Sequence, residues 1–265
     1  MSSANDLKNP AKERMKAGDV ALGMIVRLAH SGEIARVAKS TGHDFIFIDG
    51  QHALFSVETI GHIAQTALGI GIAPLVRVRS CDDPATPVIL DNGATGIIFP
   101  DVSTVEQAQR AVDACKFPPV GKRSVSAGYP QYDYRAVPLT QAVPALNDST
   151  LVICMIETEE GLANVDAIAA VDGVDVVHVG CNDLLTAMGL PGKFGCPEIM
   201  AAMDRVIAAA KKHNKFAGLG GDRDLDRQRE LVKKGVRFVT TQTDMGFLMA
   251  AAGARTAEIR KSLGG

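Results

Sequence analysis

Residues 151–183, LVICMIETEEGLANVDAIAAVDGVDVVHVGCND, contain two almost continuous apolar runs separated by one amphipathic stretch. The runs LVICMIE (151–157) and VDVVHVG (174–180) lack the polar–apolar alternation of a half-exposed strand. Continuous apolar runs of this length are typical of parallel strands that are covered on both faces. The segment therefore predicts a β-α-β unit within a parallel sheet.

The rest of the chain repeats this alternation of strand-like and helical segments. Amphipathic stretches such as VETIGHIAQTAL (57–68) and PEIMAAMDRVIAAAKKH (197–213) carry apolar residues at helical spacing. Asparagine or glycine follows several of them, as at Asn92-Gly93 and Lys234-Gly235, which is the expected chemistry of a helix C-terminus. The remaining strand-like runs occupy residues 21–28, 45–50, 73–79, 96–100, 215–221 and 236–244.

Eight strands that alternate strictly with helices predict an α/β protein of the (β/α)8 TIM-barrel type. We expect a polar segment or helix over residues 1–20 and a single barrel domain over residues 21–265. A doubly wound open sheet is the competing fold, but residues 24–30, MIVRLAH, contain none of the glycine-rich turn that such a sheet usually carries after its first strand. The proline-rich residues 117–147 interrupt the alternation, and a long excursion of this kind is more often functional or interfacial than a linker.

The composition excludes several classes of partner. The 265 residues carry 28 Lys and Arg against 30 Asp and Glu, so no global field attracts nucleic acid or an anionic membrane. No apolar run approaches the roughly 20 residues that a membrane-spanning helix needs. The five cysteines contain no C-x-x-C pair, and the N-terminus lacks the apolar core of a signal peptide, so we expect reduced thiols in a cytoplasmic protein.

Polar residues follow the strand-like runs at the positions where a barrel enzyme holds its reactive groups. In such barrels these groups collect at the carboxyl ends of the strands. Each residue alone has an ordinary structural interpretation, such as a helix cap for Asp183 or an acidic first helical turn for Glu157. The combination on several strands of one barrel favours a catalytic site. Its members are Asp49 and His52 after the second strand, Arg77 and Arg79 on the third, Glu157 after the fifth, and Asn182 and Asp183 after the sixth.

Two carboxylates, Glu157 and Asp183, at neighbouring strand ends indicate a hard divalent cation. Oxygen ligands without matching cysteine or histidine suit Mg²⁺ or Mn²⁺, and a site with few protein ligands leaves room for a chelating substrate. No lysine lies at the carboxyl end of a predicted strand, since Lys215 opens the seventh strand at the opposite end. A Schiff-base mechanism therefore lacks its nucleophile.

Several short motifs resemble, in the same order, those of the HpcH/HpaI family of class II pyruvate aldolases. The resemblance extends from about Gly23 to the C-terminus. The motifs are FIFIDGQHA (45–53), PLVRV (74–78), LDNGATGII (90–98), FPPVGKRS (117–124), MIET (155–158), VGCNDL (179–184) and MGLPG (188–192).

This resemblance implies a metal-dependent aldolase that makes or cleaves a 4-hydroxy-2-oxo acid, with pyruvate or a related 2-oxo acid as the nucleophile and an aldehyde as the acceptor. Glu157 and Asp183 resemble the metal-binding carboxylates, with Mg²⁺, Mn²⁺ or Co²⁺ as the cation. His52 resembles the catalytic base, and Asp91 corresponds to the aspartate that raises the basicity of this histidine. Arg77 resembles the residue that binds the keto oxygen and stabilises the enolate.

Further roles follow from the same resemblance. Backbone N–H groups around Gly180, Asn182 and Asp183 would bind the pyruvate carboxylate. From its place three residues before His52, we expect Asp49 to position the base or its water, or else only to orient the turn. The chain departs from the family pattern at Gln51, where many relatives have glutamate before the histidine.

Arg27, at the end of the first strand, stands where relatives often have glycine. It has two interpretations, a salt bridge to Glu33 or Asp49, or the selection of an anionic aldehyde.

The sequence leaves other functions and assemblies open. A related barrel lyase that acts on an acyl-CoA, or one that decarboxylates oxaloacetate, would use the same enolate, and a non-catalytic binding barrel is the third alternative. Family resemblance also implies a homohexamer, a trimer of dimers, in which the last helix swaps onto a neighbour. Here that helix would be residues 245–252, which could equally pack on its own barrel.

Overall fold

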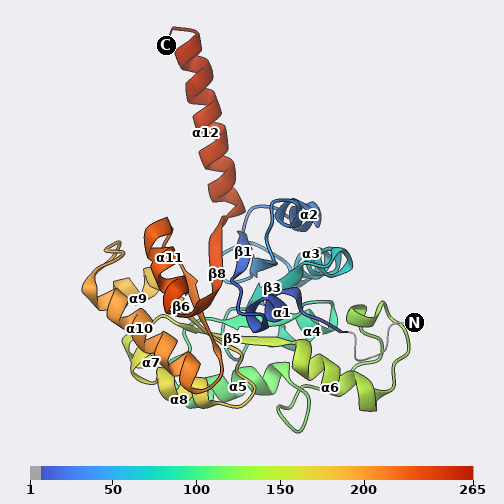
Figure 1. Cartoon of the computed structure of the whole chain (residues 1–265). Coiled ribbons are helices and arrows are strands. Elements are labelled where there is room, and N and C mark those ends of the chain that lie inside the picture. Colours follow the sequence, from blue (N-terminus) through green and yellow to red (C-terminus); the bar gives the residue numbers. More distant parts are fainter. Residues whose placement is uncertain (1–6, 265) are drawn as a thin grey trace.

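A computed structural model describes residues 7–264 of the chain, and its eight parallel strands close into one barrel in chain order (Figure 1). All eight strand-like runs of the sequence form strands, so the predicted (β/α)8 fold is confirmed. The strands are β1 (Ala21–Val26), β2 (Phe45–Asp49), β3 (Ala73–Arg77), β4 (Gly96–Phe99), β5 (Leu151–Ile156), β6 (Val176–Gly180), β7 (Phe216–Gly220) and β8 (Val236–Thr243).

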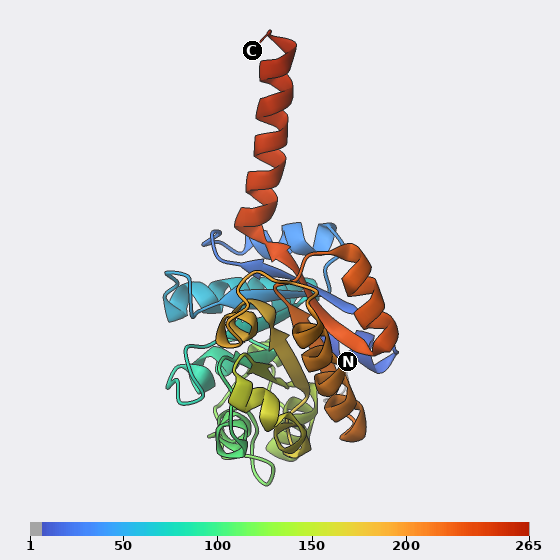
Figure 2. The same cartoon turned by 90° about the vertical axis from the view of Figure 1, so that its left-hand side faces the viewer.

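Most of the helices follow a strand and cover the outside of the barrel, whereas α1 precedes the first strand and α12 projects from the barrel (Figures 1 and 2). Local sequence sets their ends: Ser56 caps α3 through the Thr59 N–H, and Thr104 and Gln107 form a capping box at α5. The helices are α1 (Pro10–Lys16), α2 (Glu33–Ser40), α3 (Val57–Ile70), α4 (Thr86–Asp91), α5 (Val105–Cys115), η2 (Pro130–Tyr132), α6 (Leu139–Ser149), α7 (Glu159–Ala163), α8 (Val165–Ala170), α9 (Cys181–Ala187), α10 (Pro197–Lys212), α11 (Leu225–Lys234) and α12 (Asp244–Ser262).

Two apolar clusters explain why the strands are buried on both faces. The larger cluster lies between the strands and the surrounding helices, and the smaller one fills the interior of the barrel. In the interior, the rings of Phe45 and Phe238 stack with their centroids 4.3 Å apart. Gly23 leaves the space for this pair, because a Cβ atom there would lie 1.9 Å from the Phe45 ring.

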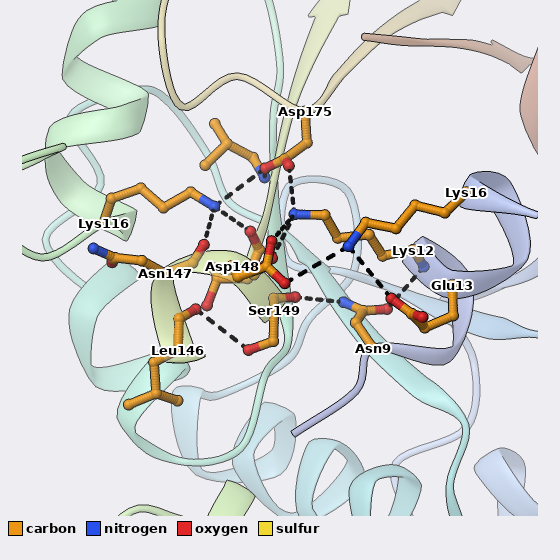
Figure 3. A network of polar contacts seen from close by, with 12 residues as sticks. Asn9, Lys12, Glu13, Lys16, Lys116, Leu146, Asn147, Asp148, Ser149 and Asp175 are labelled. Atoms are coloured by element: carbon orange, nitrogen blue, oxygen red, sulfur yellow. Dashed lines mark hydrogen bonds and ion pairs between the residues drawn. The ribbon is translucent and has the colours of Figure 1, made fainter. Parts of the chain in front are cut away.

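Helix α1 closes the amino end of the barrel. Its Ala11 and Met15 side chains belong to the interior cluster. Beside them, Asp175 accepts an ion pair from Lys12 at 2.9 Å and another from Lys116 at 3.2 Å, within the polar network of Figure 3. Burial lowers the pKa of Lys116, and the Asp175 carboxylate opposes that shift. The amino end is thus plugged, which leaves the carboxyl end for a cavity.

The excursion between α5 and β5 is ordered and has a small core of its own. Phe117, Tyr129, Tyr132, Ala142 and Leu146 pack together there, on segments that include η2 and α6. The excursion is therefore a folded part of the barrel wall and not a linker.

Helix α12 projects away from the barrel (Figures 1 and 2). Of its residues only Asp244, at the base, is buried. Asp244 accepts the backbone N–H groups of Arg27, Leu28 and Ala29, at 2.9–3.2 Å, and so ties the base of the helix to the end of β1. None of the helices within residues 7–264 is long and apolar enough to cross a membrane.

Candidate active site

A cavity of about 170 Å³ opens at the carboxyl end of the barrel. Residues of β1, β2, β3, β5, β6, β7 and β8 form its wall, together with the first turn of α9 and the segments that follow β1, β2, β5 and β7. This is the end at which enzymes of this fold carry their catalytic groups. The charged side chains of the wall are Arg27, Asp49, Arg77, Glu157, Asp183 and Arg223.

Asp49, the last residue of β2, organises one side of the cavity. Its fully buried carboxylate accepts two hydrogen bonds from Arg77, from Nε at 2.9 Å and from Nη2 at 2.7 Å. It also accepts the backbone N–H of Gln51 and of His52, at 3.1 and 3.2 Å. Burial alone would raise the pKa of Asp49, but the hydrogen bonds and charge of Arg77 keep it below its ordinary value. Asp49 is therefore an anion that fixes both the arginine and the loop that carries His52.

Arg27 forms the salt bridge that was one of its two predicted interpretations. Its Nε lies 3.1 Å from Asp49 Oδ2, and its Nη2 donates to the His52 carbonyl at 3.3 Å. The Arg27 guanidinium thus shares its counter-ion with Arg77 and lies against the backbone of the His52 loop.

Glu157 and Asp183, the two expected metal ligands, both line the cavity. Glu157 is 4% exposed, and its Oε2 accepts the Asp101 N–H at 3.2 Å. Burial, with the nearby charge of Asp183, raises the pKa of Glu157 from 4.5 to about 7. A buried carboxyl group beside a second carboxylate is poorly compensated by the protein alone, and a cation would compensate it.

Gly180, the last residue of β6, provides the room that Glu157 needs. A Cβ atom on Gly180 would lie 2.1 Å from Glu157 Oε1. The residues of this wall fit a hard divalent cation, because their donors are carboxylate oxygens and the cavity leaves space for other ligands. Within residues 7–264 no group of three or more His, Cys, Asp or Glu side chains could hold a metal ion, so water or substrate would complete the coordination.

The cavity brings together most of the residues that the sequence singled out. Arg27, Asp49, His52, Arg77, Glu157, Gly180, Asn182 and Asp183 all line it.

Asp91 does not line the cavity. It ends α4, and its carboxylate pairs with Arg123 Nη2 from the excursion. Because α4 leads into the amino end of β4, Asp91 lies away from His52 within one chain. The structure therefore shows no contact through which Asp91 could raise the basicity of His52.

The structure adds four polar residues that the sequence analysis missed. The cavity is also lined by His178 on β6, Arg223 after β7, and Thr240 and Thr243 on β8. Arg223 could have been predicted from the segment GLGGDRD (218–224), because it is a charged residue just after a predicted strand. His178 was harder to predict, because it lies within an apolar run in which inward-facing and outward-facing positions look alike.

Fold and site together define a barrel enzyme, with three carboxylates, three arginines and two histidines around one small cavity. Residues 23–251 match the model of the HpcH/HpaI aldolase/citrate lyase family, and the chain belongs to this family. It is an aldolase-type lyase, and the family membership that the sequence motifs indicated is confirmed.

Named relatives and solved structures agree with this placement. A 4-hydroxy-4-methyl-2-oxoglutarate aldolase of Hapsidospora irregularis is 37% identical and covers 92% of each chain. A 2-keto-3-deoxy-L-rhamnonate aldolase of Escherichia coli is 29% identical, over 98% of this chain and 96% of the relative. The HpcH/HpaI aldolase of Desulfitobacterium hafniense has a TM-score of 0.86 at 28% identity, with 95% of each chain covered. These relatives give less support to the acyl-CoA, decarboxylase and non-catalytic alternatives.

Proposed function

We propose that this enzyme reversibly cleaves a 4-hydroxy-2-oxo acid to pyruvate, or a related 2-oxo acid, and an aldehyde. One observation carries the proposal: Glu157 and Asp183 face the same small cavity as Arg77 and His52. Carbon–carbon cleavage of this kind passes through the enolate of the 2-oxo acid, so negative charge develops on the keto oxygen. A cation, a guanidinium and a base around one cavity match that requirement.

Glu157 and Asp183 would hold a divalent cation, Mg²⁺ or Mn²⁺, with Co²⁺ as a further candidate. When bound, the cation supplies Lewis-acid stabilisation of the developing negative charge. Backbone N–H groups at the start of α9, where no side chain caps the helix, are the proposed partners of the pyruvate carboxylate.

Arg77 is the proposed partner of the keto oxygen. Two of its N–H groups are committed to Asp49, which fixes the plane of the guanidinium and leaves other N–H groups for the substrate. Its Cζ also lies 5.2 Å from the centre of the Phe47 ring. A preorganised donor stabilises charge in the transition state without reorganisation during the reaction.

His52 is the proposed base that moves the proton, because histidine is the side chain that most often serves as a general base in enzymes. Asp49 reaches the backbone N–H of His52 and not its ring, so Asp49 positions the loop and does not share the proton. The proposed effect of Asp91 on His52 would need a contact that a single chain does not make.

Exchange of the pyruvate methyl protons for deuterium, followed by NMR in the presence of Mn²⁺, tests the reaction. We expect exchange that EDTA abolishes and added Mn²⁺ restores, and no adduct with pyruvate after borohydride reduction. Absence of exchange in the metal-loaded enzyme, or covalent trapping on a lysine, would overturn the proposal.

Two substitutions test the assigned roles. His52→Ala should slow the exchange by about 10²–10⁴-fold, the usual contribution of a positioned general base. Arg77→Ala should slow it by about 10²–10³-fold, as loss of a preorganised donor does. Arg229→Gln on the exposed face of α11 is the control, and it should exchange at the wild-type rate. Wild-type exchange in either cavity variant would show that its role is wrong.

We further propose that the chain forms a homohexamer, a trimer of dimers, in which α12 packs on a neighbouring barrel. The exposed Met245, Phe247, Leu248 and Met249 form an apolar stretch near the base of a helix that projects from its own barrel. Light scattering should give six chains for the full protein and fewer for a chain that ends after Gly246, which keeps the Asp244 contacts. A monomeric full-length protein would refute this assembly.

Five free cysteines, four of them buried, also support a proposed cytoplasmic location.

A further inference from the structure

Arg223 contributes a guanidinium to the cavity wall from the loop after β7. Among the described residues its one hydrogen bond runs from Nη1 to the Thr240 carbonyl, at 2.8 Å, and no carboxylate lies within ion-pair distance. The neighbouring Asp222 is not available to it, because Arg227 holds that carboxylate through Nε at 2.7 Å and Nη2 at 2.8 Å. Most of the N–H groups of Arg223 are therefore uncommitted.

The other two arginines of the cavity are in a different situation. Arg77 and Arg27 both pair with Asp49, at 2.7 and 3.1 Å. Burial lowers the pKa of Arg223. A partly buried guanidinium without a counter-ion is costly, and an anionic ligand would compensate it.

Two further polar side chains that line the cavity each have one atom without a hydrogen-bond partner among the described residues. His178 Nδ1 and Thr240 Oγ1 make no hydrogen bond to any described residue, although each side chain belongs to a residue only 1% exposed. The His178 ring lies against β7, where a Cβ atom on Gly218 or on Gly220 would come within 2.6 Å of a ring nitrogen. Burial, with the charges of Arg77 and Arg223, lowers the pKa of His178 to about 3, so the ring is neutral at physiological pH.

Arg223 and Arg77 lie on opposite sides of the cavity. Arg77 ends β3 and Arg223 follows β7, and in a closed barrel of eight strands in chain order these strands are four positions apart. A substrate whose keto oxygen faces Arg77 would therefore extend its distal end towards Arg223.

We propose that Arg223, with the unpartnered Thr240 hydroxyl beside it, binds a carboxylate of the acceptor, so that the enzyme prefers aldehydes or ketones that carry an acid group. The cleaved substrates would then be dicarboxylates. This inference rests on the proposed aldolase reaction and adds the chemical class of its acceptor. It assigns to Arg223 the selection of an anionic acceptor, which was one of the two interpretations of Arg27.

The test compares two acceptors of similar size, glyoxylate and acetaldehyde, with pyruvate as the donor. Arg223→Gln should lower kcat/KM for glyoxylate by about 10- to 150-fold, the usual loss for a charge-assisted hydrogen bond. It should change kcat/KM for acetaldehyde by less than about 3-fold, because a neutral acceptor never made the contact. Ratios of variant to wild type remove the different intrinsic reactivities of the two compounds.

Matched variants separate this subsite from general charge effects. Arg229→Gln also removes one positive charge from this part of the chain, at an exposed position paired with Asp226, and should change neither ratio. Arg27→Gln removes a cavity arginine that is already paired with Asp49, and should not discriminate between the two acceptors. Arg223→Lys keeps the positive charge but not the planar set of guanidinium donors, so it should give an intermediate loss of kcat/KM for glyoxylate. This variant also provides the test if Arg223→Gln fails to fold.

Pyruvate proton exchange in the same variants distinguishes failure of this inference from failure of the proposed function. Exchange should stay at the wild-type rate in Arg223→Gln, since the acceptor is absent from that assay. Equal losses for both acceptors, a loss of exchange in Arg223→Gln, or no glyoxylate turnover by a wild-type enzyme that exchanges pyruvate protons would overturn the subsite. A wild-type enzyme that exchanges no protons would overturn the aldolase reaction itself.

Discussion

Gly180→Ala should damage the proposed metal site without damaging the fold. The backbone of Gly180, at φ −89° and ψ 90°, is accessible to alanine, so the substitution acts through its added methyl group alone. That methyl would lie 2.1 Å from Glu157 Oε1 and 2.8 Å from its Cδ, whereas real Cβ contacts stay beyond 3.0 Å. The carboxylate must therefore move by about 1 Å, and its buried position and its bond from the Asp101 N–H restrict where it can go.

A displacement of about 1 Å in one of the two proposed protein ligands should weaken Mn²⁺ binding by roughly 10- to 100-fold, the range seen when the groups that orient a ligand are altered. Titration of the protein with Mn²⁺, with the free ion followed by electron paramagnetic resonance, measures this loss directly. Gly69→Ala is the matched control, because a Cβ atom at that position of α3 meets no atom within 4 Å. Wild-type Mn²⁺ affinity in Gly180→Ala would refute the reasoning, and so would an equal loss in Gly69→Ala.

Three further predictions concern stability. In the metal-free protein, Glu157→Gln should raise the free energy of unfolding by up to about 3 kcal/mol at pH 8. Burial raises the pKa of Glu157 from 4.5 to about 7. The protonated Glu157 side chain therefore adds no cost to folding below pH 4.5, and this stability is lost as the pH rises through 7. In urea unfolding, the stability gained by Glu157→Gln should disappear by pH 4.5. The pKa of His178 is about 3 in the folded protein and 6.5 in the unfolded chain, so the free energy of unfolding should fall by about 1.4 kcal/mol per pH unit as the pH drops from 6.5 towards 3. His178→Asn should reduce this slope in a series of urea unfolding curves, and an unchanged slope would contradict the assignment. Asp175→Asn leaves Lys12 and Lys116 without the carboxylate that they share, and should lower the free energy of unfolding in urea by about 3–5 kcal/mol. Pyruvate proton exchange by the folded enzyme should persist. A loss below 1 kcal/mol would show that water solvates the two ammonium groups and replaces the ion pairs.

Much of the fold was readable from the sequence because each element carries its own signal. Runs such as residues 45–50 and 174–180 are apolar throughout, since a barrel strand is buried by the interior on one face and by helices on the other. The position of reactive groups followed as well, because every parallel strand ends at the same edge. This rule placed Asp49, Glu157 and Asp183 around one cavity.

The sequence did not determine how the charged side chains pair across the cavity. Arg27 and Arg77 are separated by 50 positions, yet the pairing of β2 with β1 and β3 brings both to Asp49. Asp91 fits a family motif, but its place at the end of α4 gives it Arg123 as a partner. A motif specifies a residue type at a position in the chain, whereas an ion pair depends on which elements are neighbours in space.

The sequence by itself determined the barrel, the end that carries the site and the residue types that surround it, because periodicity and strand ends are local properties. Only the tertiary structure decided which arginine of the cavity has no carboxylate partner among the described residues. Closing the barrel places β3 opposite β7 and gives Arg27 and Arg77 a common carboxylate, while Arg227 occupies the one next to Arg223. A buried charge is satisfied by whatever group lies within about 3 Å of it, and that distance is set by packing between segments far apart in the chain.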